Sequence, residues 1–339
     1  MGQGLKAVGG NPASPPYRNG PYNWDQHVTF TKGINGIMNG GTTYYVDSSR
    51  TTSGNGKSWT KAFITIAEAV AASLAASGHH DTILIKGTDN VDSDADPVND
   101  YSESVTIDAT QVGLRIIGMG NGPEGVKWTV GTQDEVILTI NAIDCVVENI
   151  RFRPNGATSS AAIYLAQNVD SSKVANGAQI RNCIFRSTTE TALAGIYTQG
   201  ASDVIIENNV FSSVATAVLQ TETPAKVTYR MRIRNNFVDD KCTNGFVFSG
   251  RSCLIENNEF AGASLTTIIN TISCSDQGSY NVVRGHRFMV ATAFETNCVG
   301  STTDDWWGND CDDITSQSVV GTNADNAANY GQVHGYPQA

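Results

Sequence analysis

The chain has 339 residues, of which 40% are hydrophobic and 16% are charged, so it is too apolar for a disordered chain and long enough for a large core. Its 22 basic and 33 acidic residues give a formal net charge of −11, which argues against a nucleic-acid partner, because phosphate backbones require clustered cations. No apolar run has the length of a membrane span, and the N-terminus lacks the basic and apolar stretches of a secretory signal. We therefore expect a chain made without a Sec signal.

Residues 1–41 predict an extended N-terminal arm. They contain four prolines and many glycine and asparagine residues, which interrupt helices and strands, yet they are too apolar for a solvated tail. We expect this arm to dock on another surface or to support oligomerisation. The alternative, a loop wrapped on its own domain, has equal weight. The residues expected to make the contact are aromatic: Tyr17, Tyr22, Trp24 and Phe30.

A capping helix is predicted over residues 60–77. Ile66, Val70 and Leu74 recur on one face with helical spacing, and Gly78 supplies a stop signal. A stack of β-coils exposes its core and its strand edges at each end. The helix is therefore expected to cover the first coil of the repeats that follow.

The remaining sequence repeats the pattern apolar-x-Asn-x-x-apolar. The central residues are Asn149, Asn182, Asn208, Asn235 and Asn257, followed by Gly285 in a sixth copy. They lie 22 to 33 residues apart, without the two-residue turns of hairpins, which is typical of the coils of a solenoid. Two earlier segments that end at Gly87 and Gly118 predict degenerate copies.

Each central residue is predicted to occupy a kink between two strands. In the third copy, Val204, Ile206 and Asn208 share one inward parity and Phe211 has the other, so one residue must shift the alternation. Asn and Gly tolerate the left-handed backbone that such a kink requires. The side chains of these central asparagines are further expected to hydrogen-bond to one another from coil to coil.

The residue before each central position alternates in charge without exception. The six residues are Glu148, Arg181, Glu207, Arg234, Glu256 and Arg284. Stacked coils place such residues about 4.8 Å apart on the outer face. Opposite charges there stabilise neighbouring strands by roughly 0.2–1 kcal/mol per pair. The pattern therefore predicts a structural ladder that fixes the register of the coils, and these six charges need not be catalytic.

The seven cysteines are scattered and form neither a CxxC pair nor a Cys/His cluster. Cys145 and Cys253 occupy equivalent inward positions four coils apart, which is about 19 Å at the spacing of neighbouring strands. That distance exceeds the reach of a disulfide. We expect buried core thiols and no zinc site.

Two groups of residues are candidates for carbohydrate binding. Arg230 and Arg232 continue a row with Arg234 that could hold an acidic sugar, although an outward strand face is the favoured interpretation. Trp306 and Trp307 lie in an acidic cluster and could stack on sugar rings. A C-terminal cap or a partner interface is the favoured interpretation of these two tryptophans.

Acidic residues offer two further candidates. Three of them have alternate spacing in one segment: Asp92, Asp94 and Asp96. This spacing resembles an EF-hand loop, but Pro97 stands where the turn requires Gly. We therefore expect no resident cofactor, with a looser Ca²⁺ site as the alternative. The adjacent pairs Asp239-Asp240 and Asp304-Asp305 could serve glycoside hydrolysis, but such pairs favour solvated loops.

The chain resembles right-handed parallel β-helix proteins of the pectin-lyase-like superfamily. The resemblance begins with Tyr45-Val-Asp, Ser58-Trp59-x-x-Ala62-Phe63-x-Thr65-Ile66, Asp81-Thr-Ile-Leu-Ile-Lys-Gly87 and Tyr101-x-Glu103-x-Val105-x-Ile107. The Ile-Glu-Asn-Asn-x-Phe copies extend it over residues 42–290. It implies the fold but not one function, because the superfamily includes polysaccharide lyases, glycoside hydrolases, phage tailspikes and inert surface proteins.

These observations predict an all-β protein with an arm at 1–41, a β-helix with its capping helix at 42–300, and a C-terminal cap and tail at 301–339. An arm before a β-helix resembles phage virion proteins. We expect a non-enzymatic capsid decoration, fibre or spike on the particle surface, docked on capsid or tail proteins. A homotrimer is the expected oligomer, and a host-surface glycan is a further candidate partner. The alternative is a polysaccharide lyase or glycoside hydrolase that acts on host or algal glycans.

Overall fold

The computed structural model describes much of the chain between residues 41 and 311, and these residues belong to one unit, Asn39–Ala339. The described ranges are 41–76, 80–87, 100–120, 122–132, 135–155, 161–166, 174–187, 192–220, 227–239, 241–261, 265, 267–272, 280–289, 298–299, 304–307 and 309–311. The predicted docking residues and Ca²⁺ ligands lie outside them: Tyr17, Tyr22, Trp24, Phe30, Asp92, Asp94 and Asp96. No helix within the described ranges is long and apolar enough to cross a membrane.

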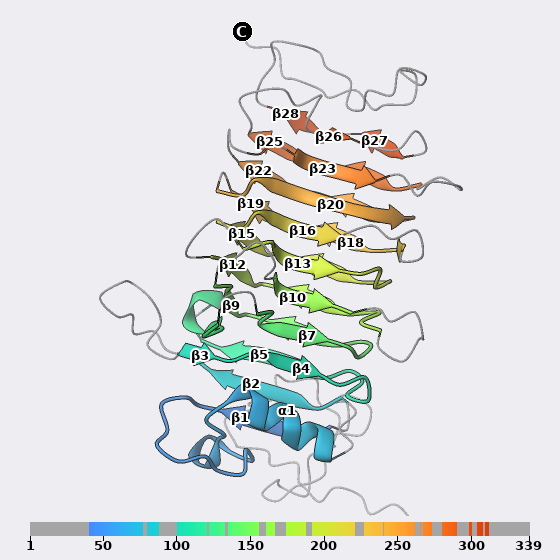
Figure 1. The fold of residues 1–339 in the computed structure, drawn as a ribbon. Coiled ribbons are helices and arrows are strands. Elements are labelled where there is room, and N and C mark those ends of the chain that lie inside the picture. Colours follow the sequence, from blue (N-terminus) through green and yellow to red (C-terminus); the bar gives the residue numbers. More distant parts are fainter. Residues whose placement is uncertain are drawn as a thin grey trace, which may run out of the picture. The chain divides into compact units, whose positions relative to one another are not determined.

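The described strands form three parallel sheets, which the chain visits in a repeating order (Figure 1). Sheet A contains β1 (Thr43–Val46), β2 (Thr82–Lys86), β5 (Arg115–Met119), β8 (Val146–Glu148), β11 (Gln179–Arg181), β14 (Ile205–Glu207), β18 (Arg232–Arg234), β21 (Leu254–Glu256), β24 (Val282–Arg284) and β27 (Asp305–Trp307). Sheet B contains β4 (Val105–Ile107), β7 (Leu138–Ile140), β10 (Ala161–Leu165), β13 (Ala194–Thr198), β16 (Thr216–Gln220), β20 (Asn244–Arg251), β23 (Thr267–Ile272) and β26 (Cys298–Val299), with β17 (Thr228–Tyr229) beside β20. Sheet C contains β3 (Asp100–Ser102), β6 (Lys127–Thr129), β9 (Arg151–Arg153), β12 (Ile184–Arg186), β15 (Val210–Ser212), β19 (Phe237–Val238), β22 (Glu259–Ala261), β25 (Arg287–Met289) and β28 (Asp310–Cys311).

From β2 to β26, each coil contributes one strand to each sheet, and successive coils pair in parallel. The architecture is the right-handed parallel β-helix that the sequence predicts. Strands β27 and β28 carry sheets A and C to Cys311, past the predicted boundary at residue 300.

The capping helix is shorter than predicted. Helix α1 (Ile66–Ala75) begins after Thr65, whose side chain accepts a hydrogen bond from the Glu68 N–H while Glu68 binds the Thr65 N–H in return. The preceding residues form the 3₁₀ turn η1 (Trp59–Lys61) and a bridge from Phe63 to Val46. They differ from the prediction because they cover the free edge of β1.

Helix α1 packs on the first coils of the β-helix. Ile66, Ala69 and Val70 are buried in the core, and α1 lies beside β1 in Figure 1. The carboxylate of Glu103 accepts hydrogen bonds from the Ile66 and Ala67 N–H groups at 2.7 and 2.8 Å. A carboxylate at a helix N-terminus satisfies free N–H groups and opposes the positive end of the helix dipole. Burial nevertheless raises the pKa of Glu103, because it disfavours the charged form.

A single left-handed residue follows each central strand of sheet A, as predicted. The residues are Asn149, Asn182, Asn208, Asn235, Asn257 and Gly285, with φ between 52° and 66°. The N–H groups of the five asparagines still donate to the next coil, for example from Asn182 to the Glu207 carbonyl at 3.2 Å. This corner therefore turns the chain from sheet A toward sheet C without interrupting the hydrogen bonds between coils.

A second left-handed corner, which the sequence did not reveal, lies two residues before most strands of sheet A. Its members are His80, Gly113, Asp144, Gly177, Asp203, Arg230, Ser252 and Tyr280. For non-glycine residues this conformation costs roughly 1–2 kcal/mol each. Hydrogen bonds between coils offset the cost, such as that from the Asp203 N–H to the Tyr229 carbonyl at 2.8 Å.

The predicted inward asparagine column consists of different residues. Asn208 is exposed, and the following residue, Asn209, is buried. The alternation of inward and outward side chains reverses at the left-handed residue Asn208 itself, and not after it as predicted. Asn209 therefore takes the inward position. The amides of Asn209, Asn236 and Asn258 bond from coil to coil, with Nδ2 to Oδ1 distances of 3.0 and 2.9 Å.

The register also corrects the alignment of the two degenerate copies. Gly118 lies opposite Ile85 and not opposite Gly87, so the two glycines occupy different positions. A side chain at Gly87 would collide with the Gly125 carbonyl of a longer turn in the next coil. Gly87 is therefore explained by that close approach and not by the repeat.

The buried polar column also contains a histidine. The Asn258 N–H donates to Nδ1 of His286 at 3.0 Å, and the His286 N–H donates to Oδ1 of Asn309. Nε2 of His286 is buried as well. Burial lowers the pKa of His286 to about 3, so the ring is neutral at pH 7.

Large aromatic side chains form a second interior column beneath sheet C. Trp128, Phe152, Phe185 and Phe211 are fully buried in consecutive coils, with ring centroids 5.5, 5.4 and 4.8 Å apart. Each ring fills the space between its neighbours, so the coils hold one another at a fixed spacing.

Four cysteines are core thiols, as expected. Buried thiols stand at Cys145, Cys183, Cys242 and Cys253. Burial raises the pKa of Cys145 and of Cys183 to about 12, which keeps both thiols protonated and unreactive.

Replacing Phe185 with alanine is expected to destabilise the protein by about 3–5 kcal/mol, because the stacked column leaves a cavity that its neighbours cannot fill. The measurement is the shift of the urea unfolding curve. Arg186→Ala is the matched control, since Arg186 is exposed on the same strand. Equal effects of the two changes would contradict the interior position of Phe185.

His286→Asn is expected to continue the amide column and to flatten the pH dependence of stability. The unfolded histidine takes up a proton below about pH 6.5 that the folded one refuses until about pH 3, so stability falls as the pH drops through this window. Thermal unfolding between pH 7.5 and 5 should therefore show a smaller loss in the variant. Identical slopes would mean that His286 takes up a proton in the folded state.

Candidate functional site

The outer face of sheet A carries the charge ladder. Its six residues stand in consecutive register positions, one for each strand: Glu148, Arg181, Glu207, Arg234, Glu256 and Arg284. Their side chains are between 14% and 37% exposed. They point away from the core residues Ile180 and Ile233, which occupy the neighbouring positions of the same strands.

The ladder consists of three ion pairs. Each arginine reaches the glutamate of the preceding coil, at 3.1 Å for Arg181–Glu148 and 2.7 Å for Arg234–Glu207. The third pair, Arg284–Glu256, also measures 2.7 Å. Partly exposed pairs of this kind contribute at most about 1 kcal/mol each. Their main effect is to favour the native register, because a slipped register would separate these charges from their partners.

A groove of about 510 Å³ opens along the corner that follows sheet A. It is lined by Ile117, Gly118, Pro123, Glu148, Asn149, Asn182 and Asn208. The groove exists because two neighbouring turns differ in length. The turn between β5 and β6 has seven residues, whereas the equivalent turn of the next coil, between β8 and β9, consists only of Asn149 and Ile150. This longer turn contains η2 (Pro123–Gly125) and forms a wall at one end of the asparagine row.

The groove can offer hydrogen bonds but has no free acid-base pair among its lining residues. The carboxylate of Glu148 already accepts hydrogen bonds from Arg181 and Asn182, at 3.1 and 3.3 Å. The remaining polar groups are amides. The repeat predicts these asparagines from the left-handed backbone and from hydrogen bonds between their side chains, and it does not predict a groove. The wall of the groove is signalled only by the inserted Gly120–Gly125 segment.

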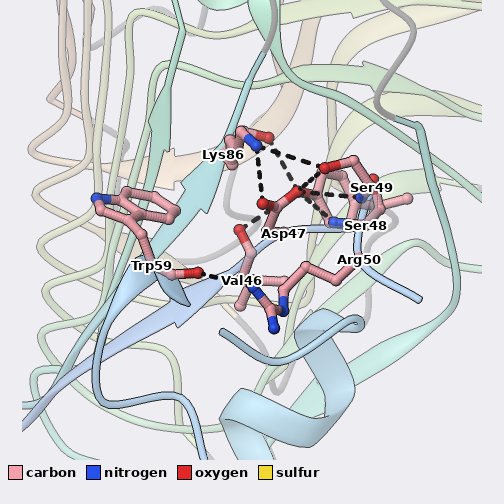
Figure 2. A network of polar contacts seen from close by, with 8 residues as sticks. Val46, Asp47, Ser48, Ser49, Arg50, Trp59 and Lys86 are labelled. Carbon is pink, nitrogen blue, oxygen red and sulfur yellow. Dashed lines mark hydrogen bonds and ion pairs between the residues drawn. The ribbon is translucent and has the colours of Figure 1, made fainter. Parts of the chain in front are cut away.

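A second polar cluster joins the first strands of sheet A to sheet C (Figure 2). Asp47 accepts hydrogen bonds from Lys86 Nζ at 2.8 Å and from the Ser49 hydroxyl at 2.5 Å. The Tyr101 hydroxyl donates to the Lys86 carbonyl at 2.9 Å, and burial raises the pKa of Tyr101 to about 12. The nearby Arg50 side chain binds the Trp59 carbonyl at 3.3 Å.

The hydrogen bond from the Ser49 hydroxyl to the Asp47 carboxylate suggests a nucleophile with its general base, but the lowered pKa of Asp47 argues against this interpretation. Burial opposes ionisation of Asp47, yet hydrogen bonds from Lys86 and Ser49 outweigh burial and lower the pKa of this carboxyl. A carboxylate with a lowered pKa is a weak general base. The cluster therefore connects β1, β2 and β3 and stabilises the first coil.

The predicted arginine row is interrupted. Arg230 lies in the left-handed corner before β18 and binds both carboxylate oxygens of Asp203 at 2.7 Å. This pairing lowers the pKa of Asp203. Arg232 is exposed on β18, two residues from the ladder residue Arg234. The three arginines thus do not present one row to an acidic sugar, because Arg230 is already paired and lies outside the strand.

Trp306 and Trp307 belong to the last strand of sheet A. Trp306 pairs in register with the core residue Val283, and Trp307 pairs with the ladder residue Arg284. These two register positions belong to opposite faces of the sheet.

The predicted carboxylate pairs are not assembled into a described site. Asp304 is buried and accepts a hydrogen bond from the Asn281 N–H at 2.9 Å, whereas Asp305 is exposed on β27. Asp239 binds the Lys241 N–H at 3.0 Å, and Asp240 lies outside the described residues. Within the described ranges, no three His, Cys, Asp or Glu side chains are grouped to hold a metal ion.

No family model and no curated protein matches the chain. Solved structures of pectin methylesterases are similar to it. The rice weevil enzyme has 12% identity and a TM-score of 0.42, covering 85% of this chain and 88% of that one. The Aspergillus niger enzyme has 12% identity and a TM-score of 0.41, covering 88% and 90%. Pectin methylesterase PemA of Erwinia chrysanthemi has 16% identity and a TM-score of 0.36, covering 87% and 81%. At these values the similarity concerns the fold alone.

The couplings along the ladder are expected to alternate in size. A double-mutant cycle of Glu207→Ala and Arg234→Ala should give up to about 1 kcal/mol, because these side chains form an ion pair. The matched cycle of Arg181→Ala and Glu207→Ala should give a smaller value, because Arg181 reaches Glu148 instead. Urea unfolding of the six proteins, wild type included, measures both. A larger coupling in the second cycle would contradict this pairing.

Proposed function

We propose that this chain is a non-enzymatic surface protein of a virion, such as a capsid decoration, a fibre or a spike, with the β-helix as its scaffold. The observation that carries the proposal is the pairing of the outer carboxylates: Glu148, Glu207 and Glu256 each bind an arginine of the next coil. Each of these carboxylates is engaged by an arginine and is therefore not available to contact a substrate. These acids support the coil stack.

Docking and assembly belong to the same proposal. Residues 1–41 attach the protein to capsid or tail proteins, and the chain acts as a homotrimer without a resident cofactor. The net charge of −11 keeps such a particle surface soluble and repels other anionic surfaces.

The competing function is enzymatic. The parallel β-helix is a fold that suits carbohydrate-acting enzymes, so a polysaccharide lyase or glycoside hydrolase is the alternative. The two functions differ in a measurable product, because only the enzyme generates unsaturated or reducing ends.

Replacing Tyr17, Tyr22, Trp24 and Phe30 with serine in the full chain is expected to remove the protein from purified virions. Loss of these four aromatic groups removes the apolar contact that the docking proposal requires. Quantitative immunoblotting of the particles measures it. Tyr229→Ala is the control, since Tyr229 is an exposed aromatic residue of the β-helix, 38% exposed, and should leave incorporation unchanged.

Two outcomes would overturn the proposal. Unchanged incorporation of the arm variant would refute docking through residues 1–41. Robust release of unsaturated or reducing ends from host or algal polysaccharides by the purified chain would replace the structural function with the enzymatic one.

A further inference from the structure

The groove beside sheet A presents a row of amide side chains. Asn149, Asn182 and Asn208 follow one another in consecutive coils, at about 4.8 Å per coil. Asn182 and Asn208 are exposed, and Asn149 is half-buried. Gly118 occupies the equivalent position in the coil before Asn149, and Pro123 closes the groove at this end of the row.

Much of the hydrogen-bonding capacity of this row is unused within the described part of the chain. Nδ2 of Asn149 donates to the Gly118 carbonyl at 2.7 Å, and Nδ2 of Asn182 donates to Glu148 at 3.3 Å. The amide oxygens of both residues and the whole amide of Asn208 make no hydrogen bond there. An amide that is open on both its donor and acceptor sides matches a hydroxyl group, which also donates and accepts.

The amides stand on a rigid base. The left-handed corners are fixed by hydrogen bonds between coils, from the N–H of Asn149 to the Arg181 carbonyl and from that of Asn208 to the Arg234 carbonyl. The wall is fixed as well, because Glu124 of η2 forms an ion pair at 3.0 Å with Arg151 of sheet C. A site whose groups are already in place loses little entropy on binding.

The charge of the groove selects the class of ligand. Its one carboxylate, Glu148, is neutralised by Arg181, so the lining is close to uncharged. Pro123 and Ile117 add small apolar surfaces to the amides. The net charge of −11 disfavours polyanions. Hydroxyl groups over an uncharged lining of amides and small apolar surfaces are the chemistry of a neutral sugar chain.

We propose that this groove binds an uncharged oligosaccharide across Asn149, Asn182 and Asn208. The site is distinct from Arg230, Arg232, Trp306 and Trp307. The inference does not rest on a virion function, because it concerns binding by the isolated full chain, and its failure would leave the incorporation result unchanged.

The test uses a glycine exchange that the repeat itself contains. Gly285 occupies the same corner with φ of 66°, so glycine can replace asparagine there without changing the backbone. The full-length chain is screened against an array of neutral gluco-, manno-, galacto- and xylo-oligosaccharides with anionic oligosaccharides beside them, and the strongest neutral ligand is titrated by calorimetry. The double variant Asn182→Gly and Asn208→Gly is expected to weaken binding about tenfold or more.

The matched control is Asn235→Gly with Asn257→Gly, which makes the same exchange in the same corner outside the groove. It should bind like the wild type. A second variant, Asn208→Asp, keeps the size and the left-handed conformation but replaces the amide by a charge, and it should also weaken binding. This variant tests the site even if the glycine variant fails to fold.

Three results would overturn the proposal. The first is no binding to any neutral oligosaccharide of the array. The second is equal loss of affinity in the groove variant and the control. The third is preferential binding of anionic oligosaccharides, which the uncharged lining does not accommodate.

Discussion

The structure depends on hydrogen bonds between coils that continue through single-residue corners. A parallel stack leaves no edge free between its ends only if each turn keeps its N–H and carbonyl groups aligned with those of the next coil. Left-handed residues at both ends of the sheet A strands meet this condition, as the bonds from Asp144, Asn182 and Asn208 show. The conformational cost is repeated in every coil, and so is the hydrogen bond that offsets it.

The columns of stacked side chains, inside and outside the β-helix, follow from this alignment of the coils. Identical register positions place Phe152 over Phe185 and Asn209 over Asn236 inside the molecule, and Glu207 beside Arg234 outside it. Interior columns contribute most of the stability, because they bury large apolar surfaces and satisfy every stacked amide. The exterior ladder contributes less energy, but it favours the native register, in which opposite charges are neighbours.

The groove arises where the regularity is broken. One coil carries a longer turn, whose η2 segment rises beside a corner that is otherwise as narrow as its neighbours. The asparagines needed for a narrow corner thereby become the floor of a depression. The left-handed corner favours asparagine for its backbone conformation, and repetition of the corner places these amides in a row. The proposed sugar binding uses this row without any change to the fold.

The sequence by itself determined the strand alternation, the repeat, the left-handed Asn corner and the order of the ladder charges, because each depends on neighbouring residues or on a strict period. It misplaced Asn208 and the start of α1, because inward parity and the edge of β1 depend on contacts between coils. It also missed the second corner, since residues as different as Gly113, Arg230 and Tyr280 serve there. Only the tertiary structure decided which asparagines are buried, which arginine pairs with which glutamate, and where the groove opens. Those outcomes depend on segments more than 20 residues apart, which meet only when the coils stack.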